Sequence, residues 1–180
     1  MTSRLPRFAP DEALPPYAHV PGRSPHPTRD PAGHRFGARP GRSDPPDPAR
    51  WRKSRAYLYG VDLFNHGYYW EAHEAWEDLW RACGRTGPTA RFLRGLIHLA
   101  AAGVKLREQR PAGVRTHARR AGALFRETAL DVGQGPTRYM GLDLRTLTEF
   151  AATLARGPES GREPPDGGVA PLFDFVLAPA

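Results

Sequence analysis

The stretch that decides the fold is FNHGYYWEAHEAWEDLW, residues 64–80. A helix turns by about 100° per residue, so positions four and seven apart share one side, and His73, Glu77 and Trp80 form a single stripe. The adjoining side collects Tyr69, Ala72, Trp76, Leu79 and Cys83, whereas Glu71, Glu74 and Asp78 fall on the opposite side. The pattern predicts an amphipathic helix in which Glu77, unlike the other carboxylates, lies at the margin of the buried face.

Similar patterns on both sides of this stretch predict further helices. Gly67 fits a left-handed C-terminal cap, so the preceding helix folds back and forms an antiparallel hairpin with the motif helix. The next helix is apolar on nearly every side and is expected to be central and buried. The expected helices begin at Pro48 after the cap Asp47, near Tyr68, near Pro88 or Thr89, at Pro111, and at Asp143 or Thr146. The sequence therefore predicts an all-α fold, a compact bundle of about five helices.

Proline marks the limits of this bundle. Of the 20 prolines, 12 lie in residues 1–50 and five in residues 158–180. We therefore expect three parts: an extended Pro/Gly/Arg-rich arm over residues 1–46, a helical domain over 47–157, and a Pro/Gly-rich tail over 158–180. A short extended segment, Leu172 to Leu177, is expected to dock on the surface.

The composition indicates a soluble chain from a reducing compartment. The N-terminus has no apolar run that resembles a signal peptide, and the longest hydrophobic stretch, around residues 92–104, is too short to span a bilayer. The single cysteine, Cys83, excludes an intramolecular disulfide and fits packing in the core. We therefore expect a cytoplasmic location and no membrane partner.

Positive charge is concentrated in one tract. The formal net charge is +7, and residues 81–126 hold eleven Lys or Arg against one acid, Glu108. Such a tract could attract phosphate, nucleic acid or an acidic protein. However, 24 of the 26 basic residues in the chain are arginines, and the tract has no interleaved aromatic series and no known nucleic-acid motif. Solvated helix faces explain the charge better, so nucleic-acid or acidic-partner binding ranks third among the functional hypotheses. A protein partner or a homo-oligomer stays open.

The motif helix and its neighbours resemble a known family. FNHGYYWEAHEAWEDLWR, followed by FLRGLIHLAAAGVKL and MGLDLRTL, is similar to the bacterial and archaeal domain-of-unknown-function 309 family over about residues 51–156. The resemblance implies a small helical fold and a metal-binding motif of His, three residues, Glu, two residues, then Trp or Tyr. His73, Glu77 and Trp80 occupy that motif here. The resemblance implies no reaction, and His98 departs from it, because members more usually have glutamine at this position.

A metal centre needs more donors than this motif supplies, since catalytic zinc commonly takes three protein ligands plus water. His98 lies on the helix expected to pack against the motif helix. With His73 and Glu77 it would make a two-histidine, one-carboxylate set suited to one divalent Zn, Fe, Mn or Ni ion. Weaker sources of a third ligand are His26 and His34 in the arm and His117 in the fourth helix. The segment HEAWE is not the zinc-protease motif, because position 77 is Glu rather than His.

The residues around the motif have simpler expected roles. Asn65 is expected to be a turn residue whose side chain bonds nearby backbone, with Tyr69 beside it. Trp76 and Trp80 are expected in the core and at its rim rather than as a ligand-stacking pair. Glu74 could assist a metal or act as a base, but its projection away from the stripe argues against this.

A function without a metal also stays open. In it, His73 and Glu77 hydrogen-bond to each other, and to Asn65 or Tyr69, as a structural pin of the hairpin. The domain would then be a non-catalytic interaction scaffold, and the turn around Gly67 resembles one tetratricopeptide-like hairpin. The sequence identifies no catalytic residue and does not decide whether the protein is an enzyme.

Overall fold

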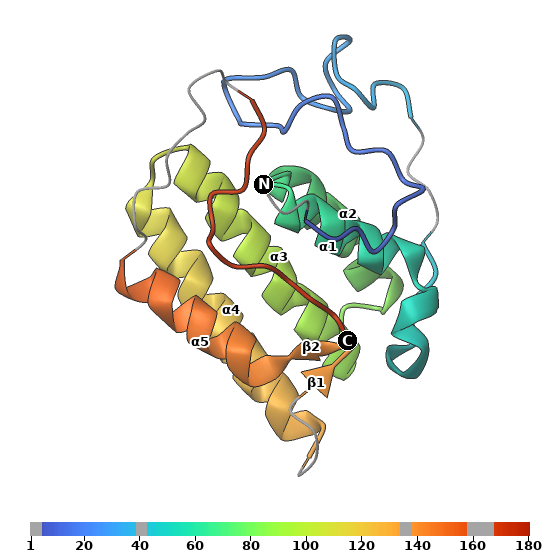
Figure 1. The fold of residues 1–180 in the computed structure, drawn as a ribbon, viewed down its shortest axis with the longest axis vertical. Coiled ribbons are helices and arrows are strands. Elements are labelled where there is room, and N and C mark those ends of the chain that lie inside the picture. The colour runs from blue at the N-terminus through green and yellow to red at the C-terminus, as the bar shows by residue number, and fades with distance from the viewer. Residues whose placement is uncertain (1–4, 39–42, 134–137, 158–167) are drawn as a thin grey trace.

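The structure is a computed structural model that describes residues 5–38, 43–133, 138–157 and 168–180. In these segments a 3₁₀ helix, η1 (Pro48–Lys53), precedes five α-helices: α1 (Arg55–Asn65), α2 (Tyr69–Ala82), α3 (Gly87–Arg107), α4 (Pro111–Asp131) and α5 (Leu144–Arg156). Two short strands, β1 (Arg138–Tyr139) and β2 (Leu142–Asp143), pair antiparallel before α5. Figure 1 shows a helical bundle, which confirms the predicted all-α class.

The first predicted helix is divided into two. Asp47 caps it as expected, since its carboxylate accepts the Ala49 N–H at 2.9 Å, but the chain from Pro48 forms the 3₁₀ helix η1. After Ser54 it continues as the α-helix α1. Trp51, just before this break, is buried and lies edge-on to Tyr57, with ring centroids 6.3 Å apart. Aromatic rings favour this edge-to-face arrangement, so the contact of Trp51 with Tyr57 packs η1 against the core.

The turn between α1 and α2 depends on Gly67. Its φ is +87°, the left-handed conformation predicted for a helix C-terminal cap. A Cβ atom at this position would also lie only 2.4 Å from the carbonyl oxygen of Ala170 in the tail. Position 67 therefore requires glycine for two reasons, the left-handed backbone conformation and the close approach of the tail.

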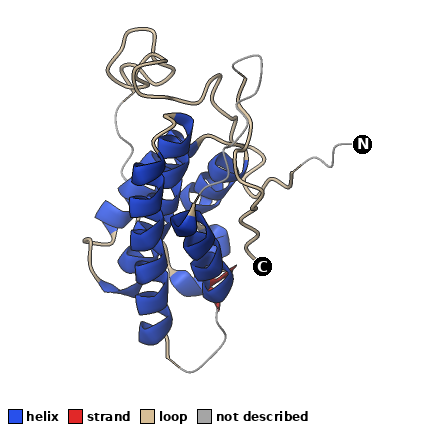
Figure 2. Ribbon diagram, turned by 90° about the vertical axis from the view of Figure 1, so that its left-hand side faces the viewer, coloured by secondary structure: helices blue, strands red, loops and turns tan. Residues whose placement is uncertain are grey.

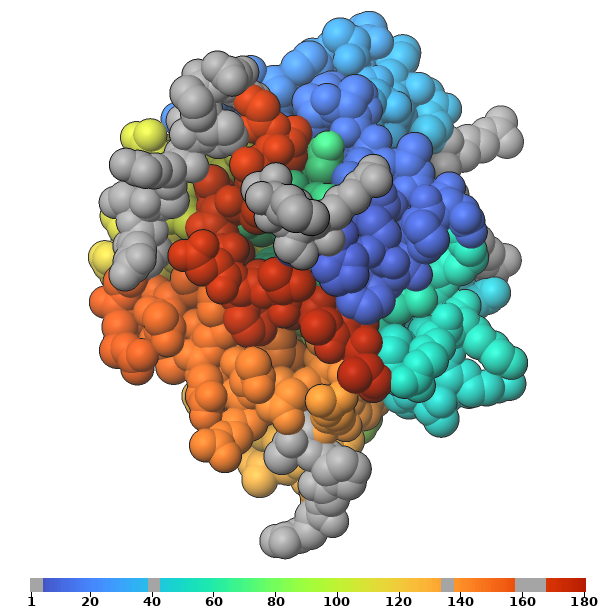
Figure 3. All heavy atoms as spheres, in the orientation of Figure 1, coloured from blue at the N-terminus to red at the C-terminus, as the bar shows by residue number. Residues whose placement is uncertain are grey.

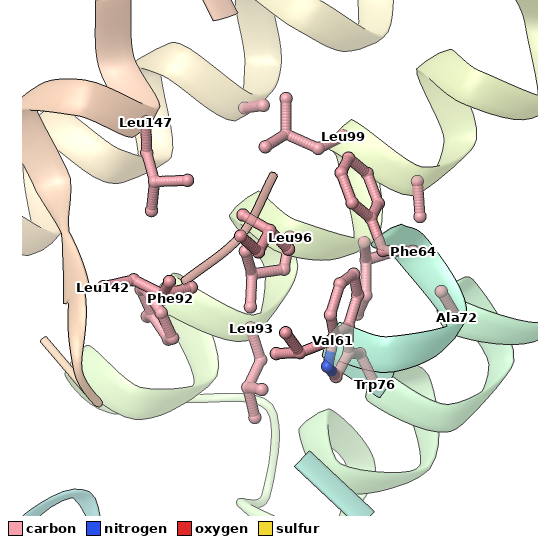
Figure 4. Close-up of a cluster of buried hydrophobic side chains, with 14 of the residues drawn as sticks. Val61, Phe64, Ala72, Trp76, Phe92, Leu93, Leu96, Leu99, Leu142 and Leu147 are labelled. Atoms are coloured by element: carbon pink, nitrogen blue, oxygen red, sulfur yellow. The ribbon is translucent and has the colours of Figure 1, made fainter. Parts of the chain in front are cut away.

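Helix α3 is the central element of the bundle. It packs against α2 on one side and α4 on the other, and α5 packs against α4. Gly103 of α3 lies under the ring of Tyr69 from α2, which a Cβ atom would approach to 2.4 Å. Figure 4 shows the core between these helices, built from the buried side chains Val61, Phe64, Trp76, Phe92, Leu96, Leu99 and Leu147.

The described part of the arm covers α1 and α2 without helix or strand (tan in Figure 2). Its main anchor is Asp62 of α1, which is fully buried. One Asp62 oxygen accepts the Arg7 Nε–H at 2.9 Å and the Ala9 N–H at 2.8 Å, and the other accepts the Phe8 N–H at 2.8 Å. A buried carboxylate is stable when it is paired and fully hydrogen-bonded, so the arm and Asp62 depend on each other.

The described part of the tail, residues 168–180, crosses the same face of the molecule beside the arm (red and dark blue in Figure 3). Phe173 inserts its ring against Phe64, with centroids 5.7 Å apart, and Phe175 stacks on Phe150 of α5 at 4.0 Å. The segment Leu172–Leu177 makes no strand; the first ten residues of the expected tail, 158–167, lie outside the described residues. None of the described helices is long and apolar enough to cross a membrane.

Candidate metal centre on helix α2

The rotation of α2 about its axis is set by three buried side chains, Ala72, Trp76 and Leu79. Trp76 is completely buried, as predicted, and its indole N–H donates to the Tyr57 carbonyl oxygen at 3.3 Å. With this face held in the core, His73 and Glu77 lie at its partly exposed edge. Their side chains are 30% and 25% exposed, so they are accessible to an ion from solvent.

Glu74 joins these two residues. One donor atom from each of His73, Glu74 and Glu77 lies within 4.8 Å of the other two, a spacing at which the three could hold a metal ion. The His73 Nδ1 atom is 3.4 Å from the Glu74 carboxylate, and it is buried without a hydrogen-bond partner. The contact with the imidazole lowers the pKa of Glu74, which keeps this carboxylate ionised at neutral pH. The sequence projection placed Glu74 on the opposite side of the helix from His73 and Glu77, whereas in the structure a carboxylate oxygen of Glu74 lies close to both.

Glu77 has a cationic partner one turn along the helix. Its carboxylate lies 3.0 Å from the Arg81 guanidinium, which also pairs with Asp78 at 3.1 Å. Among the described residues no hydrogen bond links Glu77 to His73. The expected partners of a structural pin, Asn65 and Tyr69, instead bond to the tail: Tyr69 accepts the Leu172 N–H at 2.8 Å.

His98 lies on α3 and forms a pair with His117 of α4. Their Nδ1 atoms are 3.1 Å apart, and the ring centroids are separated by 5.3 Å. Burial lowers the pKa of His98 to about 4, with a further contribution from His117. Burial likewise lowers the pKa of His117, and His73 adds a smaller effect to both, so the three imidazoles are electrostatic neighbours. His98 is not part of the group formed by His73, Glu74 and Glu77.

Trp80 completes the predicted stripe at the rim of the core. It is half-buried, and the guanidinium of Arg85 lies over its ring at 5.3 Å. Its indole Nε1 is buried without a hydrogen-bond partner. Trp80 is therefore not a metal ligand, since an indole N–H has no lone pair to offer.

The sequence prediction is wrong for Glu71. The projection placed this residue with the solvated acids, but it is 6% exposed because the arm covers it. Its Oε1 accepts the backbone N–H of His19 at 2.8 Å and lies 3.4 Å from Nε2 of the His34 ring. Its Oε2 has no hydrogen-bond partner. Burial raises the pKa of Glu71 to about 7. The sequence of α2 alone does not predict that Glu71 is buried. The histidines of the arm are the sequence signal that could have indicated a buried carboxylate partner.

Comparison with known proteins supports the resemblance over part of the chain. Residues 57–117 match the model of the family described as Domain of unknown function (DUF309), which confirms the predicted resemblance. The matched segment contains His73, Glu74, Glu77, Trp80, His98 and His117. No protein with a curated description matches the chain.

Proposed function

We propose that the helical domain of this protein, which matches the DUF309 model over residues 57–117, binds one divalent transition metal on helix α2, with His73, Glu74 and Glu77 as donors. One observation carries the proposal: donor atoms of the three side chains lie within 4.8 Å of one another. Nitrogen and oxygen ligands lie about 2.0–2.2 Å from zinc, so two ligands of one ion are at most roughly 4.4 Å apart. Small side-chain rotations therefore suffice to bring the three atoms around one ion.

The donor set suits this class of ion. Imidazole and carboxylate together favour Zn, Fe, Mn or Ni over Ca or Mg, which prefer oxygen ligands alone. The His73 Nδ1 atom has no hydrogen bond to give up on binding. Because all three side chains are partly exposed, an ion held by them would keep open positions for water or a ligand. A bound ion of this kind supplies Lewis acidity.

The ion pair between Glu77 and Arg81 is a weak competitor. The Arg81 side chain is 47% exposed and that of Glu77 is 25% exposed. Pairs of this kind contribute only about 0–1 kcal/mol to stability. A divalent ion can therefore displace Arg81 from the carboxylate at little cost, and Asp78 remains available to the guanidinium.

His98, with His117 beside it, is the donor that we propose from outside α2. Two imidazoles bound to one ion through bonds of about 2.0–2.1 Å have nitrogen atoms roughly 3–3.4 Å apart. The 3.1 Å between His98 Nδ1 and His117 Nδ1 falls in this range. Both histidines have a lowered pKa, so each is neutral at pH 7 with a lone pair on one ring nitrogen; one of the two Nδ1 atoms carries the proton of their hydrogen bond and would change tautomer to bind an ion.

The test is direct metal binding by the full chain. Protein stripped with a chelator is titrated with Zn²⁺, Mn²⁺ and Ni²⁺ by calorimetry, and the metal that remains after gel filtration is counted. We expect about one equivalent in the wild type, and loss of binding in His73→Ala and Glu77→Gln. Asp78→Asn, which neutralises the adjacent carboxylate outside the group, is the matched control and should bind as the wild type does.

Two results would contradict this function. The wild type, folded by circular dichroism, could take up no metal at stoichiometric concentrations. Alternatively, His73→Ala and Glu77→Gln could lower the unfolding temperature without any metal being bound by the wild type, as a structural role predicts. His98→Ala separates the contribution of the second helix: we expect weaker binding, about tenfold or more, with the stoichiometry of the wild type.

A further inference from the structure

A hollow of about 280 Å³ lies where the end of α2, the start of α3 and the facing side of α4 meet. Trp80 and three arginines, Arg85, Arg91 and Arg94, line it, together with one carboxylate, Glu127. A concave site with several convergent polar groups is the usual form of a small-molecule site. This hollow is separate from the metal-binding group, but it begins at Trp80, one helical turn after Glu77.

The arginines carry more charge than their neighbours compensate. Arg91 lies 3.4 Å from Glu127 and also pairs with Asp131, so these two carboxylates more than balance its single charge. Arg85 and Arg94 form no ion pair with any residue in the part of the chain that the structure describes. Arg85 and Arg94 are exposed and lie at one concave site without a carboxylate partner in the described part of the chain, an arrangement that favours an anion.

Neutral donors in the same place add to this preference. The Trp80 indole N–H is buried without an acceptor. Helix α3 begins at the hollow, and the side chain of its N-cap residue, Thr86, makes no capping hydrogen bond. Apart from Pro88, which has no N–H, the backbone of the first turn is therefore not capped by this side chain, and the partial positive charge of the helix end acts in the same direction as the arginines.

We propose that this hollow binds the phosphate group of a small phosphate monoester. Such a group carries about −1.5 to −2 charge at pH 7, and Arg85 and Arg94 supply two guanidinium groups that have no carboxylate partner among the described residues. Guanidinium binds phosphate oxygens with two parallel hydrogen bonds, which makes arginine well suited to this ligand. The volume of about 280 Å³ is just below the roughly 300–1,000 Å³ of small-molecule sites, so a small phosphorylated molecule fits better than a polymer.

The experiment is calorimetric titration of the full chain at low salt, with a chelator present so that the result does not depend on the proposed metal. Phenyl phosphate is the monoester probe, and inorganic phosphate is titrated in parallel. We expect saturable binding of one equivalent of the ester. In the double variant Arg85→Gln/Arg94→Gln we expect binding at least about tenfold weaker, since two charged hydrogen-bond donors are lost.

The control variant also removes two arginine charges, but at positions outside the hollow. Arg115→Gln/Arg119→Gln lies on α4 outside the hollow and should bind the ester within about twofold of the wild type. All these arginines are surface residues, and circular dichroism and thermal unfolding check that each variant is folded. The proposal is overturned if no ester binds, if both double variants lose binding equally, or if inorganic phosphate binds and the ester does not. Binding of an oligonucleotide but not of the ester, with steep salt dependence, would likewise overturn it.

Discussion

Asn65 of α1 and Leu177 of the tail are joined by two hydrogen bonds: the Asn65 amide donates to the Leu177 carbonyl oxygen, and the Leu177 N–H donates to the Asn65 amide oxygen, each at 2.8 Å. Both residues are buried, 2% and 1% exposed. The side-chain amide of Asn65 therefore forms with the tail backbone the same pair of hydrogen bonds that a neighbouring β-strand would form. The expectation that Asn65 bonds nearby backbone is wrong, because its partner is 112 residues away.

Replacement of Asn65 by Ala should release the tail. The substitution leaves the N–H and the carbonyl of Leu177 without partners in a buried place, and each such group costs about 1–3 kcal/mol. We expect the free energy of unfolding to fall by roughly 2–6 kcal/mol, measured by urea denaturation. The tail should also become more sensitive to limited proteolysis than that of the wild type.

A control for this experiment is Thr116→Ala, which removes an exposed side-chain hydrogen bond within α4. It should change the free energy of unfolding by less than about 0.5 kcal/mol. If Asn65→Ala is as stable as this control, the two hydrogen bonds do not hold the tail.

Asp62 should have the corresponding role for the arm. Asp62→Ala leaves the N–H groups of Phe8 and Ala9 and the Arg7 guanidinium without their acceptor. We expect a loss of about 3 kcal/mol or more, because the carboxylate is fully buried and all its partners are donors. Urea denaturation measures the loss, and trypsin should then cleave the arm, which is rich in arginine.

Arg7→Gln provides the comparison, because it removes the cation and keeps the two backbone donors to Asp62. Arg7 is 23% exposed, so its ion pair is partly screened by solvent. We expect less than half the loss seen in Asp62→Ala. Equal losses in the two variants would show that the ion pair, rather than the backbone hydrogen bonds, anchors the arm.

Local patterns predict much of this fold. Asp143, one of the two expected start positions, caps α5 and accepts the Thr146 N–H at 2.7 Å, and Gly67 adopts the expected left-handed conformation after α1. Both signals act within a few residues of where they occur, so the sequence shows them directly. The period of apolar residues likewise predicts the buried face of α2 around Trp76.

The candidate site was predicted only in part, for a physical reason. The positions of His73 and Glu77 follow from helix geometry, but their partners depend on side-chain rotation and on neighbouring elements. His98 and His117 are 19 residues apart and meet only because α3 and α4 pack together. Glu71 is buried by an irregular arm whose path has no period, and such non-local contacts leave no pattern around the residue itself.

The histidine pair should show unusual titration. Burial lowers the pKa of His98 to about 4, below the ordinary value of 6.5. The folded protein therefore binds fewer protons than the unfolded chain between these values, so the contribution of His98 to stability is present above about pH 6.5 and is lost as the pH falls towards 4. NMR titration of the imidazole nitrogens should find His98 neutral at pH 5.5.

His117→Ala tests the cause of this shift. The variant removes a neighbouring imidazole and opens the site to water, so the pKa of His98 should rise towards its ordinary value. If NMR titration of the wild type finds His98 protonated at pH 5.5, or if the variant leaves its titration unchanged, the pair does not control this pKa.

Glu71 should make the docked arm sensitive to pH in the opposite sense. Its pKa is raised by burial from 4.5 to about 7, so the folded protein holds a proton that the unfolded chain has already released. The stability that comes from this proton is present below about pH 4.5, decreases as the pH rises, and is lost above about pH 7. Glu71→Gln mimics the protonated acid and should abolish the dependence. The variant should be more stable than the wild type at pH 8, by on the order of 2–3 kcal/mol, and nearly equal to it at pH 4.5.

Comparing the wild type with Glu71→Gln separates the effect of Glu71 on stability from that of the neighbouring histidines. Burial lowers the pKa of His19 and His34, so their contribution to stability rises towards pH 6.5 and opposes that of Glu71. Both histidines are present in the wild type and in Glu71→Gln, and their effect largely cancels in the difference between the two. Glu149→Gln, at an exposed position of α5, controls for the loss of one surface charge. A difference in unfolding free energy between wild type and Glu71→Gln that stays constant from pH 4.5 to 8 would show that the carboxyl of Glu71 titrates alike in the folded and unfolded chains, and that the arm does not respond to it.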